Sequence, residues 1–540
     1  MKHLKFKFIS AFLAAIIISS GFACFSASAA EISAPAKGQT LFLPSAGLKP
    51  YIATDDMPQS YRTPQEYIPA IKYQETDICW AFATASNYEI FSLKNGLSLD
   101  LDLAQNDYLE TSIDKWASNL NNPGGFGWTR NTGEGSYLRA GMGYLTSWQT
   151  APVGITAIQY QYNLQSPDIF AAKKQIMDYG SIAVGYTVNK AFESADETCY
   201  FAPPGVPLNN AFGHAVAIIG WDDNFAKENF TNYYGILPQN NGAWLCRNSW
   251  GDYNDLDGYF WISYEDDTIE FNYDPSFTIS DYMLVTDDYR MYQNEIFGAL
   301  YSIYYPMPQD GVTFMNVFDF NPNYNTIDKV VFEQAMPGSE YSVYYIPFDA
   351  VANAPTQDVE KWQWLYSGVT DYAGYICADL TDTALPAGKG AIGIKITSAI
   401  SSDIAVMGTC EDLFYIDPQD AKVTMFDAAF VTGKSYIYDP MAETPLYDLP
   451  LYYQDVMGDG GGATFVIKAI TRLRDDYTPL LGDADMDGTV SISDVTEIQK
   501  HLAKLNNLNS YQLANCDFNK DGEVAVDDAT DIQKFLAGII

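Results

Sequence analysis

The sequence predicts a multidomain α+β protein, and three observations support this fold class. The chain has 540 residues, whereas a single hydrophobic core rarely grows beyond roughly 250–300 residues. Residues 57–270 mix helical and strand patterns, whereas residues 272–470 contain short alternating apolar runs between turn residues, which is typical of a β-sandwich. Residues 482–540 hold two copies of an Asp-rich loop followed by a helix.

The N-terminal residues 1–29 are predicted to be a secretory signal peptide. Three lysines within the first seven residues precede the short apolar run Phe8–Ile18, and Ala27–Ala29 offers a small-residue cleavage site. The alternative, a membrane anchor, is disfavoured because the apolar run is too short to span a bilayer. We therefore expect a secreted, extracellular protein with a short lead-in over residues 30–56.

The composition excludes two classes of partner. The formal net charge is −38, and binding to nucleic acid requires clustered Lys and Arg. The same negative charge disfavours anionic membranes. Hydrophobic residues make up 47% of the chain and charged residues 18%, which is typical of folded rather than disordered chains. We expect no nucleic-acid partner and no membrane partner.

Local patterns predict the elements of the first two folded regions. Apolar residues at helical spacing predict helices over Trp80–Lys94 and Phe170–Tyr179. Strands are predicted from apolar or alternating runs, which are Ile182–Tyr186, His214–Trp221, Ala243–Arg247, Gly258–Tyr264, Glu340–Ile346 and Ala391–Ile396.

Cys79 is the candidate nucleophile. It directly precedes the helix predicted to begin at Trp80, and the positive end of a helix dipole favours a thiolate. The alternative for a lone cysteine is a buried structural thiol. Six cysteines remain after removal of the signal peptide, which is too few for a disulfide scaffold, and their pairing stays open.

His214 and Asn248 complete the candidate site. The mature chain has only two histidines, at 214 and 501, and His214 follows Cys79 by 135 residues. This separation falls in the window of about 130–150 residues known for one class of cysteine nucleophile. Asn248 lies further downstream, which an insertion around residues 224–242 explains. A thiolate beside a protonated imidazole can attack a peptide carbonyl.

Four motifs in this order resemble the papain-like cysteine peptidases: Cys79–Ala83, Gly213–Val216, Asn248–Gly251 and Gly258–Ile262. The resemblance covers residues 57–270 and implies a helical lobe, a β-barrel lobe and a cleft between them. It implies hydrolysis of protein or peptide substrates. Asn248 would hold the imidazole of His214, as an acid does in a serine triad.

The resemblance also assigns Gln74 to the oxyanion hole, together with the backbone N–H of Cys79. The segment from Gln74 to Cys79 is one residue shorter than in the family and lacks an upstream cysteine. The cysteine that would pair with it is also missing, from Asn122–Gly125. Asp77 and Ile78 replace small residues beside the nucleophile, and residues 30–56 are too short for the family's inhibitory pro-segment.

Residues 272–470 resemble the lectin-like β-sandwich that follows the peptidase in some bacterial members. The matching text is Tyr273–Asp274, Tyr372–Tyr375 and Leu385–Gly388. Two roles stay open for this domain. It could bind carbohydrate through exposed Tyr and Trp side chains, or it could brace the catalytic unit.

The two Asp-rich loops have the side chains of calcium sites. Each places oxygen ligands at loop positions 1, 3, 5 and 12, glycine at 6 and a backbone carbonyl at 7, as in EF-hands. Two calcium ions are expected, one in each loop. The predicted ligands are Asp483, Asp485, Asp487, Thr489 and Asp494 in the first loop, and Asp517, Asn519, Asp521, Glu523 and Asp528 in the second. Unlike EF-hands, the loops have Asp at position 12 and are expected to have only an exiting helix.

This duplicated loop–helix pattern resembles a type I dockerin over residues 482–540, after a linker at 471–481. The resemblance implies a calcium-folded module that binds a cohesin on a scaffold protein, as in a cellulosome. Ile492–Ser493 and Val526–Asp527 lie where the family reads its partner. The predicted function is a secreted cysteine endopeptidase on a scaffold. The alternative is a catalytically weak peptidase fold that targets the same complex.

Overall fold

The computed structural model describes residues 57–97, 109–118, 130–161, 164–165, 169–205, 211–269, 275–295, 301–305, 310–398, 405–412, 414–415, 423–424, 432–451 and 463–540. The predicted signal peptide and lead-in, and the segments 122–125 and 273–274, lie outside these residues. None of the helices in the described ranges combines the length and the apolarity needed to cross a membrane.

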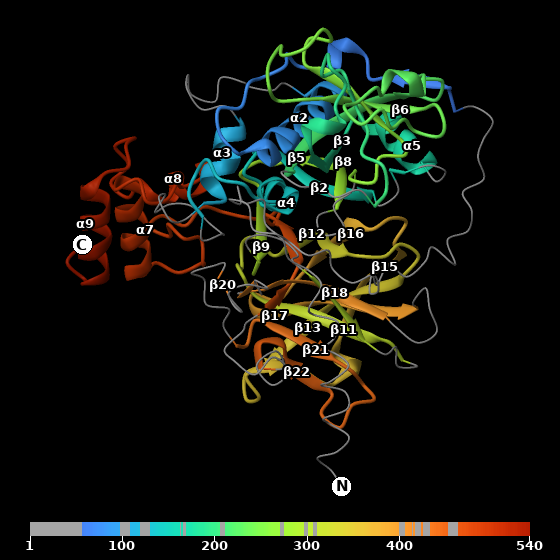
Figure 1. Ribbon diagram of the computed structural model, residues 1–540. Helices are drawn as coiled ribbons and strands as arrows, with labels where there is room; N and C mark the ends of the chain where they lie inside the picture. The colour runs from blue at the N-terminus through green and yellow to red at the C-terminus, as the bar shows by residue number, and fades with distance from the viewer. Residues whose placement is uncertain are drawn as a thin grey trace.

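The N-terminal region packs helices against an antiparallel sheet (Figure 1). Its central helix α2 (Cys79–Lys94) is buried along almost its whole length, because it is enclosed by α3 and α4 on one side and by strands on the other. The remaining helices are α3 (Leu109–Trp116), α4 (Leu138–Thr146) and α5 (Phe170–Tyr179). The helices predicted over 80–94 and 170–179 are confirmed.

The strands of this region follow one another in the order β4-β7-β6-β5-β3-β8-β2. The pairs are antiparallel except β4 with β7. The strands are β1 (Ser60–Arg62), β2 (Val153–Gln161), β3 (Ile182–Val188), β4 (Cys199–Tyr200), β5 (Phe212–Asp222), β6 (Ala243–Arg247), β7 (Tyr259–Ser263) and β8 (Ser276–Leu284). All four strands predicted here are confirmed.

The sandwich region stacks two sheets around an aromatic and aliphatic core that includes Phe314, Phe332, Ile394 and Phe465. One sheet has the order β16-β12-β24-β9, and the other has β14-β13-β17-β11-β21-β22 with β15 on β13. Their strands are β9 (Tyr289–Gln293), β11 (Val312–Phe320), β12 (Thr326–Gln334), β13 (Glu340–Asp349), β14 (Ala354–Pro355), β15 (Gln363–Val369), β16 (Gly374–Ala384), β17 (Gly388–Ser398), β21 (Ser435–Tyr438), β22 (Leu446–Asp448) and β24 (Ile467–Arg472).

Shorter elements complete this part of the chain. A three-stranded sheet joins β10 (Tyr301–Tyr305), β18 (Ala405–Asp412) and β23 (Ala463–Phe465), and β19 (Phe414–Tyr415) pairs with β20 (Val423–Thr424). The short 3-10 helices of the whole chain are η2 (Gln65–Tyr67), η3 (Lys190–Phe192), η4 (Lys227–Asn229) and η5 (Val359–Lys361). The β-sandwich predicted for this region is confirmed.

A single twelve-stranded sheet runs through both regions, because β2 pairs with β16. Gly374 begins β16 with φ +135°, and a Cβ there would lie 2.0 Å from the backbone oxygen of Ile158 in β2. Next to this contact, the buried Glu333 accepts a hydrogen bond of 2.5 Å from the hydroxyl of Tyr160. Arg139 of α4 also reaches Glu333, at 3.4 Å.

The C-terminal region is a small helical unit beside the sandwich (Figure 1). Helices α7 (Ile492–Leu502) and α9 (Val526–Leu536) follow the two Asp-rich loops, as predicted, and pack together around Val495, Ile498 and Ile532.

The expectation of an exiting helix alone is wrong for the second loop, because α8 (Ser510–Cys516) leads directly into it. The sequence of α8 gives no apolar period long enough to predict. Its first turn is instead held by a capping box between Asn509 and Gln512.

Replacement of Gly374 by alanine tests whether the shared sheet holds the two regions together. We expect Gly374→Ala to cost at least about 3 kcal/mol, since the new Cβ forces β16 away from β2 and the backbone is strained. Gly388→Ala is the matched control, because its φ of +88° is also left-handed but its Cβ would meet nothing within 4 Å. The control should cost only roughly 1–2 kcal/mol. If calorimetry shows that both variants lose the same free energy of unfolding, this assignment is contradicted.

Candidate functional site

The nucleophile candidate lies at the start of the central helix. Cys79 is the first residue of α2 and is 8% exposed. The helix packs against β5, the strand that carries His214. A thiol in this place lies at the positive end of a sixteen-residue helix, where the dipole favours the thiolate.

His214 and Asn248 are brought together by neighbouring strands. His214 lies in β5, Asn248 directly follows β6, and the two strands pair. His214 Nε2 lies 2.8 Å from Asn248 Oδ1. An amide oxygen can only accept, so Nε2 carries the proton in this contact and Nδ1 is left as the basic nitrogen.

The amide of Asn248 is fixed on both sides. Its Oδ1 also accepts a 2.8 Å hydrogen bond from the backbone N–H of Ser249, and its Nδ2 donates to the hydroxyl of Tyr253 at 2.9 Å. These contacts determine which end of the amide faces the imidazole. Tyr253 was not predicted from the sequence, and its position five residues after Asn248 is the only signal that pointed to it.

Aromatic rings enclose the imidazole of His214. Trp250 stacks on it with ring centroids 4.5 Å apart and an interplanar angle of 25°, and Tyr186 of β3 approaches edge-on at 5.8 Å. The ammonium group of Lys190 lies 5.0 Å from the centre of the Trp250 ring. Burial lowers the pKa of His214 to about 4, the hydrogen bond to Asn248 opposes this shift, and the charge of Lys190 adds to it.

Gln74 lies beside Ser249, the residue that follows Asn248, and its side chain bonds to residues close to it. Its Oε1 accepts a 2.5 Å hydrogen bond from the hydroxyl of Ser249, and its backbone N–H donates to the carbonyl of Ser249 at 2.8 Å. Its Nε2 donates to the backbone oxygen of Thr76 at 3.0 Å. The shortened segment therefore keeps Gln74 next to Asn248, with its amide turned toward its own loop.

A buried ion pair supports the loop that precedes Cys79. The backbone N–H of Asp77 donates to Gly133 at 3.1 Å, and the N–H of Gly133 donates to Asp114 Oδ2 at 2.8 Å. Asp114 Oδ1 lies 2.6 Å from the guanidinium group of Arg130, which also packs over the ring of Trp80. These contacts hold the loop in a chain that lacks the family's upstream cysteine.

Four further cysteines, Cys199, Cys246, Cys377 and Cys516, have free thiols with raised pKa values. Burial raises the pKa of Cys199 to about 11, of Cys377 to about 12 and of Cys516 to about 12, and raises that of Cys246 well above its usual value. Such thiols are un-ionised at neutral pH and react slowly. No disulfide joins these four cysteines or Cys79.

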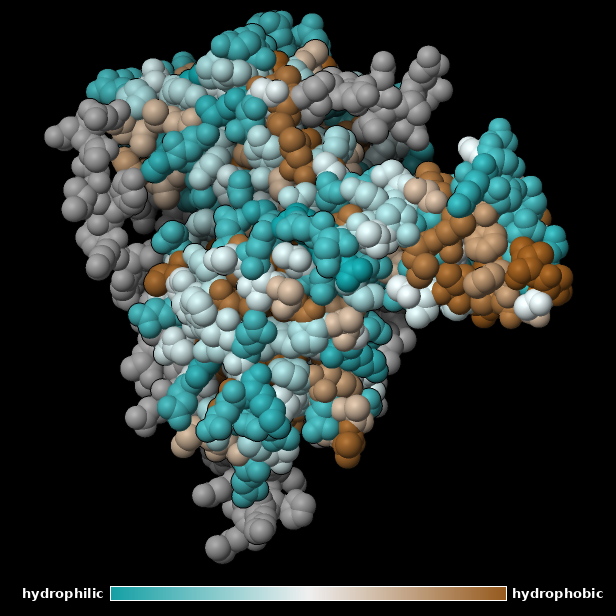
Figure 2. All heavy atoms as spheres, turned by 180° about the vertical axis from the view of Figure 1, so that it is seen from behind, coloured by the Kyte–Doolittle hydropathy of each residue, from teal (hydrophilic) through white to brown (hydrophobic). Residues whose placement is uncertain are grey.

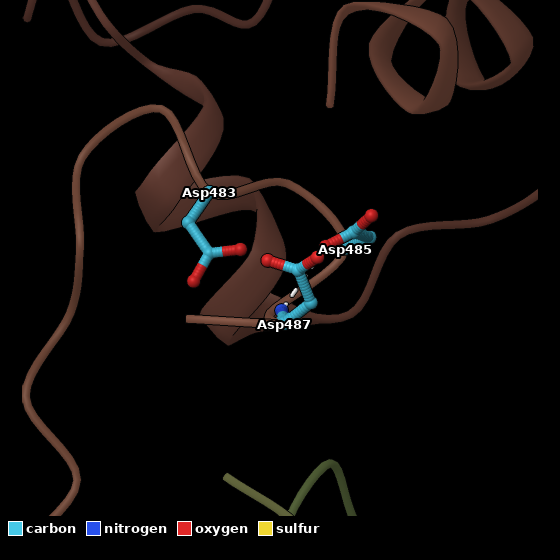
Figure 3. Close-up of side chains that lie close together, drawn as sticks. All are labelled: Asp483, Asp485 and Asp487. Carbon is cyan, nitrogen blue, oxygen red and sulfur yellow. Dashed lines mark hydrogen bonds between the residues drawn. The ribbon is translucent and has the colours of Figure 1, made fainter. Parts of the chain in front are cut away.

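The first Asp-rich loop gathers three carboxylates (Figure 3). One oxygen each of Asp483, Asp485 and Asp487 lie within 4.8 Å of one another. Asp483 is fully buried, and its Oδ1 has no hydrogen-bond partner. Burial, and then repulsion by Asp494 and the other carboxylates, raise the pKa of Asp483 to about 7. An orphaned buried oxygen among hard oxygen donors fits a calcium ion.

The remaining residues of the first loop shape it from within. Asp494 is buried and accepts backbone hydrogen bonds from Asp485 at 3.1 Å and Ser491 at 2.6 Å, which ties the start of α7 to the loop. The hydroxyl of Thr489 donates to Asp487 Oδ1 at 2.7 Å. Four of the five predicted ligands thus lie on the loop, whereas Asp494 lies in the first turn of α7, outside the three-carboxylate cluster.

The second loop repeats the hydrogen bonds of the first. Asp517 Oδ2 accepts from the N–H of Gly522 at 3.0 Å, as Asp483 does from Gly488. Asp528 accepts from the N–H of Asn519 at 3.1 Å, and the N–H of Glu523 donates to Asp521 at 3.0 Å. The two loops therefore share these backbone hydrogen bonds and carry oxygen-bearing residues at the same positions.

Three family models match successive parts of the chain. The papain family cysteine protease model matches residues 127–279, the lectin like domain model matches 291–442, and the dockerin type I domain model matches 481–537. The chain therefore contains a papain-family cysteine protease domain. Its peptidase is joined to a lectin-like domain and a type I dockerin, which is a calcium-binding class of domain.

Two solved structures share the peptidase and lectin-like architecture. A clostridial cysteine protease, Cwp84 after propeptide cleavage, is 29% identical, with a TM-score of 0.63 over 77% of this chain and 99% of that chain. The cysteine protease and lectin-like domains of Cwp84, a surface layer associated protein of Clostridium difficile, are 28% identical, with a TM-score of 0.61 over 77% of this chain and 89% of that chain. None of the curated proteins matches the sequence significantly.

The burial of His214 predicts a pH-dependent stability of the peptidase domain. Its pKa is about 4 in the folded chain and about 6.5 when unfolded. Between these values the unfolded state binds more protons, so the free energy of unfolding falls as pH falls, by about 3 kcal/mol in total. We expect this in denaturant titrations of Cys79→Ala at pH 7 and pH 4.5. His214→Gln in the same background is the control, and an unchanged pH slope there would contradict the assignment.

Proposed function

We propose that this protein is a secreted cysteine endopeptidase in which Cys79 attacks the peptide bond, His214 is its base and Asn248 positions His214. The observation that carries the proposal is the 2.8 Å contact from His214 Nε2 to Asn248 Oδ1. It commits one ring nitrogen to an acceptor and leaves Nδ1 free to exchange a proton with a thiol.

The proposed reaction has two halves. His214 takes the thiol proton of Cys79, the sulfur bonds to the carbonyl carbon, the C–N bond breaks, and the imidazolium of His214 gives that proton to the leaving amine. Water then attacks the thioester while His214 accepts its proton, and the acid product leaves with Cys79 restored. Trp250 and Tyr186 exclude water from the imidazole. The charge that develops on His214 in this dry site is supported by Asn248.

Gln74 is proposed as the side-chain donor of the oxyanion hole. Its hydrogen bonds to Ser249 support this role, because they tie it to the residue that follows Asn248. Its Nε2 donates to Thr76 in the structure described here. The amide would therefore have to turn from Thr76 toward the substrate oxygen as the tetrahedral intermediate forms.

Reactivity toward an epoxide inhibitor tests the catalytic assignment. Among Cys79, Cys199, Cys246, Cys377 and Cys516, we expect Cys79 alone to be alkylated at neutral pH, because the raised pKa values of the other four keep them un-ionised. Cys79→Ala should remove labelling and lower kcat for casein or a peptide by at least about 1,000-fold. Cys199→Ser is the matched control and should retain both. Full activity of Cys79→Ala, or labelling that persists in His214→Ala, would reject the roles.

The dockerin is proposed to anchor the enzyme to a cohesin on a scaffold protein, with one calcium ion in each loop. Calcium would neutralise the carboxylates of each loop and hold the following helix. The exposed ends of α7 and α9 support partner binding there, since Ile492 is 62% exposed and Val526 is 69% exposed. Figure 2 shows apolar side chains gathered on this part of the surface.

Calcium titration tests the two-ion proposal. Calorimetry of the full chain should give two ions per molecule, and Asp483→Asn or Asp517→Asn should each remove one. Chelator should unfold α7 and α9, seen as lost helical circular dichroism and as lost cohesin binding. Asp475→Asn, outside both loops, is the control. Cohesin binding that survives excess chelator would reject a calcium-dependent anchor.

A carbohydrate-binding role of the lectin-like domain stays a prediction. Trp364 of β15 supports it, because its side chain is 60% exposed and its indole N–H donates to the hydroxyl of Ser367 at 2.8 Å. This bond holds the ring at a fixed angle on the surface, where its face is available for stacking.

A further inference from the structure

The two dockerin loops differ most at position 4. Met486 and Lys520 both have left-handed backbone conformations, with φ of +60° and +63°. Met486 is 1% exposed, whereas Lys520 is exposed. Since the two loops otherwise share their hydrogen bonds, the difference comes from what the first loop contacts.

Met486 contacts the lectin-like domain and the segment that connects this domain to the dockerin. Met486 packs in one cluster with Tyr324 and Leu473, and with Tyr477 and Tyr511 at its edge. Tyr324 lies in the connection between β11 and β12. Burial of a methionine side chain removes apolar surface from water, so the cluster favours a fixed dockerin.

Hydrogen bonds surround this apolar contact. Asn323 Nδ2 donates to the backbone oxygen of Met486 at 2.8 Å, and Asn321 Nδ2 donates to that of Asp485 at 3.4 Å. Both acceptors are backbone carbonyls at positions 3 and 4 of the loop. The carboxylates of the loop face its interior, so cation binding and this contact use different atoms.

The connection between β8 and β9 forms the second part of the surface. Asp287 Oδ2 accepts from the backbone N–H of Ser510 at 2.9 Å, and Asp288 Oδ1 accepts from the hydroxyl of Tyr511 at 2.6 Å. Asn509 Nδ2 donates to the hydroxyl of Tyr324 at 3.0 Å. Three successive residues at the start of α8 thus contact the β8–β9 and β11–β12 connections.

The segment predicted as a linker is also held. The backbone N–H of Leu473 donates to Asp288 at 2.7 Å, and that of Arg474 donates to Asn323 at 2.9 Å. The hydroxyl of Tyr477 and the amide of Asn515 in α8 lie within hydrogen-bond distance, at 3.0 Å. Only residues 475–481 separate these anchors from the first loop.

We propose that Asn321–Tyr324 and Asp287–Asp288 form a docking surface for the first loop and the start of α8 of the chain's own dockerin, with Met486 as its anchor. The dockerin is therefore presented as a fixed part of the enzyme rather than on a free tether. Ile492 and Val526 stay exposed, so a partner can bind α7 or α9 without displacing the contact. The docking rests neither on catalysis nor on partner binding.

Two variants separate docking from dockerin folding. Met486→Lys places in the first loop the residue that the second loop already carries at the same backbone conformation, so the repeat itself should fold. Asn323→Asp is close to isosteric but replaces the donor by an acceptor facing the carbonyl of Met486. Lys520→Met is the matched control, because it makes the reverse change at an exposed position.

Hydrogen exchange of the full chain in saturating calcium measures the docking. In Met486→Lys and Asn323→Asp, we expect the amides of Arg474 and Ser510 to exchange at least about tenfold faster, equivalent to roughly 1.4 kcal/mol. In X-ray scattering, the maximum dimension should grow by up to about 25 Å, the reach of seven extended residues. Lys520→Met should change neither quantity.

The outcome of Asn323→Asp decides the proposal, because this residue lies outside the dockerin. Unchanged exchange at Arg474 and Ser510 together with an unchanged maximum dimension would overturn it. Faster exchange confined to these amides, with the core of α7 and α9 still protected, would support it.

Discussion

The pairing of β2 with β16 is the constraint on which the rest of the structure depends. It joins the peptidase and the lectin-like domain into one twelve-stranded sheet, and glycine at 374 is needed because the strands approach too closely for a side chain. Tyr160 and Arg139 reach across the same junction to the buried Glu333. A backbone ladder and a buried polar contact therefore join the two domains at this junction.

The candidate catalytic set depends on that rigid sheet, since β5 and β6 place His214 and Asn248 side by side. The site is dry and aromatic, and this environment both lowers the pKa of the free imidazole and strengthens any charge pair that forms within it. The same burial keeps the other described thiols protonated. Burial thus raises the pKa values of Cys199, Cys246, Cys377 and Cys516, whereas Cys79 lies at the N-terminus of α2.

The dockerin shows how a duplicated motif becomes asymmetric. Both loops keep the oxygen donors and the glycine that a cation site needs, because these depend on local backbone geometry. Position 4 points away from the cation and is free to differ. Met486 packs against the lectin-like domain, while Lys520 is exposed to solvent.

The sequence by itself determined the local features of this protein. It predicted α2, α5, the strands around His214, the sandwich and the two Asp-rich loops, because apolar periodicity and fixed ligand spacing are short-range properties. It missed α8, whose first turn depends on capping rather than periodicity. Only the tertiary structure placed Tyr186 and Met486, since contacts between segments distant in the chain leave no periodic signal in either one.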